Sequence, residues 1–225
     1  VDYYFLYGKD GDGNVALFRE LTGQAKLAPL WTFGFWQCKE RYKSAEEVAD
    51  VVRKYRDLGV PLDAIVQDWK YWGEENYTWN ALEFNNPSFR NHQKMFSSLK
   101  DMNAKMMITV WPSVGDSTRI NKDLSEMGAL FPMQTSPREA KVYDVWNKKA
   151  RDLFWSYMNR NLFEPGMSAW WLDGPEPEFY NTSPGDFNIQ TGEGTLRNIR
   201  NTYPLFVSKG VYENQRSVTD SKRVY

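Results

Sequence analysis

The sequence predicts an α/β protein whose parallel strands are arranged as a barrel. Along the 225 residues, short apolar runs typical of strands alternate with amphipathic segments long enough to form helices, a pattern typical of βαβ units. Each apolar run ends on acidic or aromatic residues, and the carboxyl ends of the strands in a parallel barrel open on one face. A doubly wound sheet is the alternative. It favours a glycine-rich phosphate-binding turn after its first strand, and the sequence has no such turn.

The first elements are expected in residues 1–59. Residues 1–24 predict a short β segment with a tight turn at 9–14, which resembles a calcium loop but lacks the glycine and closing acid of an EF-hand. Residues 31–37 form the first apolar strand candidate. Ser44 and Glu47 then form a capping box for a helix.

The later segments continue the alternation and predict about four to five parallel strands in all. The expected elements are a strand at 63–67, a helix at 88–102, a strand at 105–110, a helix ending near 127, a helix at 147–162, a strand at 168–172, a helical stretch at 195–216 interrupted at Pro204, and the opening of a further strand at 222–225.

Composition excludes several classes of function. With 28 basic and 29 acidic residues, the net charge is -1, so no electrostatic attraction to nucleic acid or an anionic membrane is expected. No stretch approaches eighteen apolar residues, so no membrane span is predicted. The single histidine argues against a histidine-rich zinc site or a Ser-His-Asp triad.

The most informative segment is residues 170–178, where an apolar strand runs into Asp173, a Gly-Pro turn and then Glu176 and Glu178. Cleavage of a glycosidic bond needs two carboxyl groups, about 5–5.5 Å apart in retaining enzymes. Asp173, at the strand end, is the best candidate for the nucleophile. Glu176 could accept hydrogen bonds from sugar hydroxyls or hold a neighbouring cation.

Other strand ends supply residues suited to a sugar. Asp68 could accept hydrogen bonds from two hydroxyls, and charged donors could come from Lys39 and Arg41. Apolar faces for a pyranose ring could come from Trp69, Trp111 and Trp171. A single acid after a strand is more often a helix cap or a turn residue, and a single Trp is more often core. Four successive strands that end in this way favour a site.

Four blocks of the sequence resemble glycoside hydrolase family 31, the retaining α-glucosidase and α-xylosidase family. They are PLWTFGFWQCKERY at 29–42, IVQDWKYWG at 65–73, TVWP at 109–112, and YDVWN at 143–147 together with WWLDGPEP at 170–177. The resemblance implies a (β/α)8 catalytic barrel, a double-displacement mechanism and an oligosaccharide substrate with a terminal α-xylosyl or α-glucosyl residue. It implies that Asp173 is the nucleophile, that Asp68 binds hydroxyls and that Trp111 lines the subsite. It implies no cofactor.

The resemblance also implies that the chain is the first half of the barrel. Residues 1–24 are then the end of a preceding β domain or a linker, and 25–225 the N-terminal half of the (β/α)8 catalytic domain. The general acid/base aspartate is expected beyond Tyr225, so little turnover is expected from this segment alone. The open edge of such a half barrel predicts self-association. A periplasmic or secreted bacterial location is expected by resemblance.

Two departures from the family pattern and two alternative functions remain. Cys38 stands where a serine is usual, and as a small residue it is expected to be buried. Pro175 stiffens the turn after Asp173. A non-catalytic carbohydrate-binding protein could use the same aromatic site. An unrelated barrel enzyme, such as an aldolase or isomerase, would instead call for a lysine, a phosphate site or a metal cluster, and none stands out.

Overall fold

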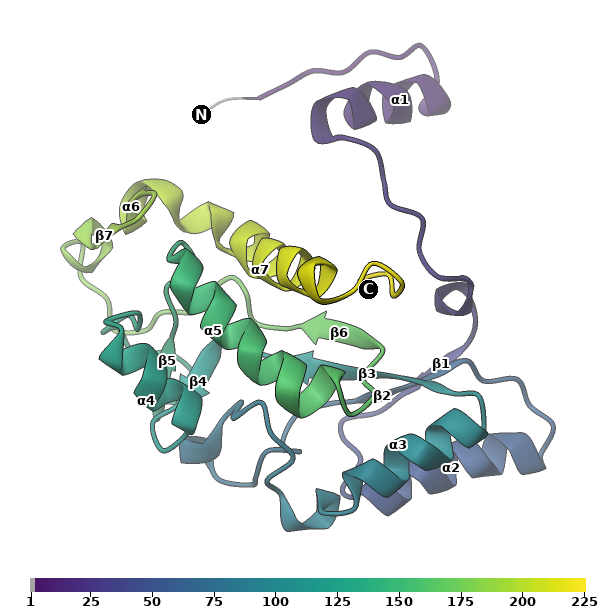
Figure 1. The fold of residues 1–225 in the computed structure, drawn as a ribbon. Coiled ribbons are helices and arrows are strands. Elements are labelled where there is room, and N and C mark those ends of the chain that lie inside the picture. Colours follow the sequence, from purple (N-terminus) through teal and green to yellow (C-terminus); the bar gives the residue numbers. More distant parts are fainter. Residues whose placement is uncertain (1–2) are drawn as a thin grey trace.

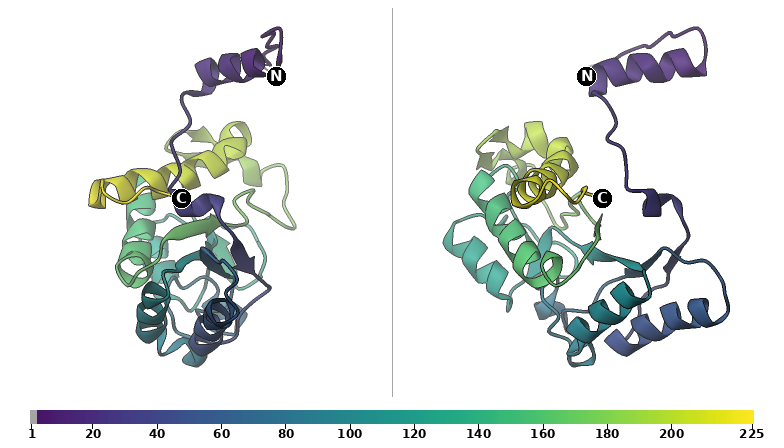
Figure 2. Two further views of the ribbon diagram at one scale, coloured as in Figure 1. Left: turned by 90° about the vertical axis from the view of Figure 1, so that its right-hand side faces the viewer. Right: turned by 45° about the vertical axis from the view of Figure 1, so that its right-hand side comes forward.

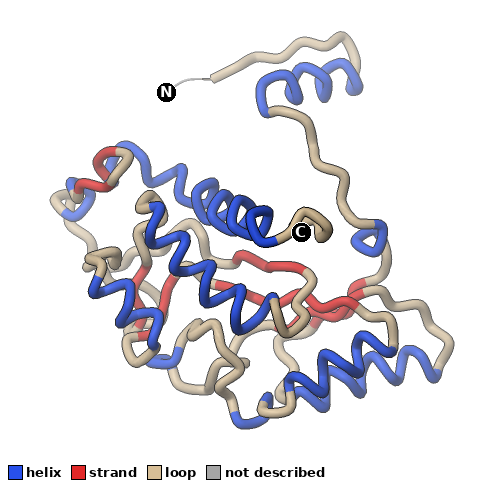
Figure 3. The backbone as a smooth tube through the Cα atoms, in the orientation of Figure 1, coloured by secondary structure: helices blue, strands red, loops and turns tan. Residues whose placement is uncertain are grey.

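The computed structural model describes residues 3–225 and is built around a parallel sheet in the order β1-β2-β3-β6 (Figure 1). Its strands are β1 (Trp36–Cys38), β2 (Ala64–Gln67), β3 (Lys105–Val110) and β6 (Ala169–Leu172). All three neighbouring pairs are parallel. The strands lie at the centre with helices around them (Figure 3), so the predicted α/β fold is confirmed as an open partial barrel.

The remaining elements surround this sheet. The α-helices are α1 (Gly11–Thr22), α2 (Ala45–Asp57), α3 (His92–Asp101), α4 (Arg119–Glu126), α5 (Lys148–Met158), α6 (Leu196–Ile199) and α7 (Tyr203–Val218). Two antiparallel ribbons pair β4 (Ser113–Gly115) with β5 (Ala140–Val142), and β7 (Gln190–Thr191) with β8 (Gly194–Thr195). Short 3₁₀ turns are η1 (Leu30–Phe33), η2 (Asn76–Thr78), η3 (Pro87–Phe89), η5 (Asp186–Asn188) and η6 (Arg200–Thr202), and the π-helical turn η4 (Asn159–Phe163) extends α5.

Local capping explains where several helices begin. The Ser44 hydroxyl accepts a hydrogen bond from the backbone N–H of Glu47 at 3.1 Å, and the Glu47 carboxylate accepts one from the N–H of Lys43 at 2.6 Å. These bonds satisfy N–H groups that have no partner inside the helix, which confirms the predicted cap of α2. Pro204 lies in the first turn of α7, where its missing N–H costs nothing, and this accounts for the predicted interruption.

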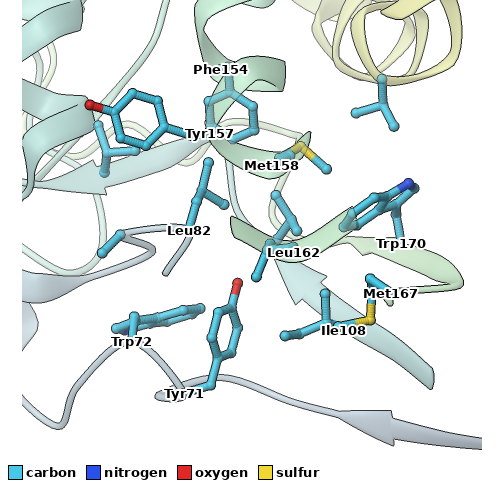
Figure 4. Close-up of a cluster of buried hydrophobic side chains, with 14 of the residues drawn as sticks. Tyr71, Trp72, Leu82, Ile108, Phe154, Tyr157, Met158, Leu162, Met167 and Trp170 are labelled. Carbon is cyan, nitrogen blue, oxygen red and sulfur yellow. The ribbon is translucent and has the colours of Figure 1, made fainter. Parts of the chain in front are cut away.

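The hydrophobic core lies between the sheet and the helices that cover it. Ile108 of β3, Met158 of α5 and Leu162 of η4 are all fully buried there (Figure 4). The indole of Trp170 on β6 donates to the Gln215 side chain of α7 at 2.8 Å, so a buried polar atom ties that helix to the sheet. This packing holds β3 and β6 side by side, which is what places their carboxyl ends together.

The expected β segment and tight turn in residues 1–24 are wrong for the part that the structure describes. The Asp10 carboxylate accepts from the N–H of Gly13 at 2.7 Å and caps α1. Asp and Gly are typical both of turns and of helix N-termini, so the turn signal marked a helix start. No residue of α1 is buried, and the helix lies apart from the sheet and its covering helices (Figure 2). Its helical state therefore rests on local bonds.

Three further expectations need correction. Residues 31–33 belong to η1, and the first strand begins only at Trp36. Cys38 is exposed, not buried, because β1 is an edge strand of an open sheet. Residues 222–225 form no strand, although the N–H of Trp170 donates to the carbonyl of Tyr225 at 2.8 Å and the chain thus runs beside β6.

Candidate active site

The candidate site forms where β2, β3 and β6 end. Asp68, Trp111 and Asp173 each directly follow the last residue of one of these strands. The N–H of Asp173 donates to the carbonyl of Val110 at 2.9 Å, which continues the pairing of β6 with β3. The Thr109 hydroxyl donates to Asp68 Oδ1 at 3.1 Å and so ties β3 to the end of β2. The parallel register therefore brings together residues that are far apart in the sequence.

A cavity of about 400 Å³ opens beside these strand ends, a volume within the usual range for small-ligand sites. Its lining combines carboxylates with indole rings, the mixture that a sugar with polar edges and apolar faces requires. The lining residues are Trp69, Trp79, Trp111, Pro112, Ser113, Thr135, Ser136, Val142, Asp173, Gly174, Glu176 and Glu178.

The surroundings of Asp173 disfavour the ionised form of its carboxyl group. Burial raises the pKa of its carboxyl, and the nearby negative charges of Asp68, Glu176 and Glu178 raise it further. The backbone N–H of Gly174, which donates to Asp173 Oδ1 at 2.9 Å, acts in the opposite direction. Cationic or hydrogen-bond-donating groups of a ligand would stabilise the ionised form of this carboxylate and are therefore favoured beside it.

The aromatic wall of the cavity is a packed cluster of indole rings. The Trp79 ring meets the Trp111 ring at a centroid distance of 5.2 Å and the Trp69 ring at 5.6 Å, both nearly edge to face. Edge-to-face packing is a favoured arrangement for aromatic pairs. The Trp111 ring also lies against Gly174: a Cβ atom on that glycine would be only 2.4 Å from Trp111 Cζ3. The tryptophan wall and the turn after Asp173 therefore touch.

Four residues predicted from the sequence are not part of the cavity lining. Arg41 forms a two-pronged ion pair with the Glu74 carboxylate at 2.8 and 3.2 Å, and Lys39 pairs with Glu47. Trp171 is half-buried on β6, two residues before Asp173 and so on the same face of the strand, but it is not part of the lining. Asp68 is not among the lining residues either, but its charge is close enough to raise the pKa of Asp173.

Other lining residues were not anticipated. Trp79 follows η2 in the loop between β2 and α3, and the only sequence signal for it is the density of aromatic residues at 69–79. Ser113 and Val142 come from the β4–β5 ribbon, whose strands are three residues long and too short for a periodic pattern. Glu178 lines the cavity, although as a loop acid it would ordinarily be read as solvated.

Two negative findings apply to residues 3–225. No three His, Cys, Asp or Glu side chains are grouped in a way that could hold a metal ion. None of the helices described there has the length and apolar character needed to cross a membrane.

Parallel strands that deliver carboxylates and tryptophans to one cavity at their carboxyl ends define the chain as part of a (β/α)-barrel protein. The family model described as the Glycosyl hydrolases family 31 TIM-barrel domain matches residues 25–225. The chain belongs to glycoside hydrolase family 31. An alpha-xylosidase from Saccharolobus solfataricus is 37% identical over 229 residues, covering 100% of this chain and 30% of that protein.

Solved structures agree with this assignment. The GH31 alpha-xylosidase from Xanthomonas citri superposes with a TM-score of 0.84 at 32% sequence identity, covering 94% of this chain and 24% of that one. A GH31 alpha-xylosidase from a soil metagenome, complexed with xylose, superposes with a TM-score of 0.76 at 26% sequence identity. The match covers 88% of this chain and 30% of the chain of that structure. The chain thus spans about a third or less of the length of these relatives.

Proposed function

We propose that the full-length protein containing this chain is a retaining glycoside hydrolase that removes terminal α-xylosyl or α-glucosyl residues from oligosaccharides, with Asp173 as its nucleophile. The observation that carries the proposal is the position of Asp173, at the end of β6 and in the wall of a cavity lined by Trp69 and Trp111. The relatives named alpha-xylosidase support the xyloside as the preferred substrate.

The geometry supports a particular role for each of these side chains. The ionised carboxylate of Asp173 attacks the anomeric carbon, while the N–H of Gly174 holds Oδ1 and directs the carboxylate. Asp68 accepts from the Trp69 N–H and the Thr109 hydroxyl through Oδ1, and within residues 3–225 its Oδ2 remains to accept from a sugar hydroxyl.

The indole of Trp111 offers an apolar face to the pyranose ring, and Glu176 accepts from hydroxyls at the edge of the cavity. In this proposal, the acid/base that protonates the leaving oxygen belongs to another part of the full-length protein. We therefore expect the isolated 225-residue segment to show little turnover, because a general acid contributes on the order of 10²–10⁴-fold.

Covalent trapping tests the nucleophile. A fluorinated glycosyl fluoride, which forms the glycosyl-enzyme but releases it slowly, should label the full-length protein on the peptide that contains Asp173, as read by mass spectrometry. Asp173→Asn should abolish the label and lower kcat/KM for an aryl α-xyloside by at least about 10³-fold. A label on another carboxylate would refute the assignment.

A non-catalytic carbohydrate-binding protein is the second candidate, and the aromatic wall of three indoles favours it as much as it favours an enzyme. Turnover and covalent labelling distinguish the two functions. If the full-length protein binds xylosyl oligosaccharides by calorimetry but neither turns them over nor accepts the covalent label, the binding function is correct. Comparison of kcat/KM for aryl α-xylosides and aryl α-glucosides decides between the two sugars.

We also propose that residues 25–225 are the first half of the catalytic barrel and that residues 1–24 belong to a preceding domain or linker. In support, α1 buries none of its side chains. The exposed aromatic rings of Phe33 and Phe35 beside β1 would drive self-association of the isolated 225-residue chain. A monomer in gel filtration at all concentrations would contradict that proposal.

A further inference from the structure

The side-chain amide of Asn80 forms hydrogen bonds to the backbone of Trp111 through both its oxygen and its nitrogen. Its Oδ1 accepts from the N–H of Trp111 at 3.1 Å, and its Nδ2 donates to the carbonyl of the same residue. Trp111 lies one residue beyond β3. The amide therefore substitutes for a strand partner at the point where the ladder has ended.

These two hydrogen bonds depend on having an asparagine at position 80. Asn80 is fully buried and has a φ of +49°, a left-handed conformation that asparagine adopts more readily than most residues. A buried amide with both ends bonded is costly to replace, because each lost bond leaves a buried polar group without a partner. The neighbouring carbonyl of Trp79 accepts from the N–H of Gly115 at 2.8 Å, so the same loop also holds the chain four residues further on.

The position of the Trp111 backbone can affect the Asp173 carboxylate through the contact between the Trp111 ring and Gly174. The Trp111 ring lies against Gly174, where a Cβ atom would be 2.4 Å from Cζ3 and 2.5 Å from Cε3. The N–H of Gly174 donates to Asp173 Oδ1. A shift of the Trp111 backbone would move the ring over the turn that orients the carboxylate.

We infer that Asn80 is a positioning residue: it sets the place of the Trp111 ring and, through Gly174, the direction of the Asp173 carboxylate. The inference rests on the proposed glycosidase function for its kinetic test. Its structural content, that Asn80 decides where the Trp111 ring lies, is independent of that function.

The kinetic test compares two buried asparagines in the full-length protein. Asn80→Asp keeps the size of the side chain, removes the donor and places a carboxylate against the Trp111 carbonyl. The matched control is Asn86→Asp, since Asn86 is also buried and donates to the carbonyl of Lys70 and the carboxylate of Glu74, both at 2.9 Å. We expect Asn80→Asp to lower kcat/KM by on the order of 10- to 100-fold and the control to leave it within about 2-fold.

A double-mutant cycle shows whether Asn80 acts through Trp111. Trp111→Ala removes the ring but retains the backbone groups that Asn80 holds. In that background, Asn80→Asp should change kcat/KM by less than about 3-fold, because interacting residues are not additive, while its effect on thermal stability persists. If the two losses multiply fully, or if Asn86→Asp lowers kcat/KM as much as Asn80→Asp does, the inference is wrong.

A spectroscopic readout separates the inference from the proposed function. With 5-fluorotryptophan incorporated, the ¹⁹F resonance of Trp111 is assigned by its loss in Trp111→Phe. Asn80→Asp should shift or broaden this resonance, and Asn86→Asp should leave it in place. An unmoved resonance in Asn80→Asp overturns the inference even if Asp173 is labelled. A moved resonance supports it even if the labelling of Asp173 fails.

Discussion

The contact between Gly174 and Trp111 makes a sharp prediction for Gly174→Ala. Gly174 has a φ of +61°, and its missing Cβ leaves room for the Trp111 ring. Substitution adds two costs. One is the left-handed backbone, which any residue with a Cβ pays; the other is a collision with the indole.

The size of each cost follows from the structure. A left-handed alanine costs roughly 1–2 kcal/mol of unfolding free energy. A Cβ at 2.4 Å from Trp111 Cζ3 is about 1 Å closer than the 3.4 Å at which ordinary contacts begin, so the ring must withdraw by about that distance. A displacement of about 1 Å at a positioning group lowers the rate by about 10²-fold, or about 2.7 kcal/mol of transition-state stabilisation.

Gly128→Ala is the matched control for Gly174→Ala. Gly128 has a φ of +64° with nothing within 4 Å of a Cβ, so it carries the backbone cost without the collision. Denaturant unfolding and kcat/KM for an aryl α-xyloside, both measured on the full-length protein, separate the two effects. Both variants should lose stability, and only Gly174→Ala should lose activity by about 10²-fold. The reasoning fails if Gly174→Ala retains wild-type kcat/KM, or if Gly128→Ala loses as much.

Three further predictions follow from the same structure. Asp173→Asn should raise the free energy of unfolding at pH 7, because the raised pKa means that the ionised Asp173 destabilises the folded state; this advantage should vanish in unfolding curves taken below pH of about 3.9, where the carboxyl is protonated in both states. Arg41→Ala should leave kcat/KM unchanged and cost less than about 1 kcal/mol in denaturant unfolding, because its partner Glu74 is half-exposed and lies outside the cavity. Ile108→Ala, at a fully buried position in β3, should cost about 2–5 kcal/mol by the same measurement.

Each of these has an outcome that would contradict it. An Asp173→Asn variant less stable than the wild type at pH 7 would mean that the carboxylate has a stabilising partner. A large loss of kcat/KM in Arg41→Ala would mean that Arg41 contacts the substrate. A loss below about 1 kcal/mol for Ile108→Ala would mean that the core repacks around the missing methyl groups.

Much of the fold could be predicted from local patterns. The apolar run at 105–110 coincides with β3, and the Ser44 cap marks the start of α2, because strand length and capping depend on residues next to one another in the chain. Asp173 was also predictable as a strand-end acid. The β segment in residues 1–24 was wrong because the residues that favour a turn also cap a helix.

The sequence by itself determined that successive parallel strands would end on Asp68, Trp111 and Asp173, since alternation and run length are properties of neighbouring residues. Only the tertiary structure decided what surrounds them. In the folded chain, Arg41 forms an ion pair with Glu74, 33 residues further along the sequence. Asn80 forms hydrogen bonds to Trp111, 31 residues further along. Such contacts depend on how loops of different strands meet at one end of the sheet, where the steric fit of whole side chains, rather than their pattern along the chain, selects the partners.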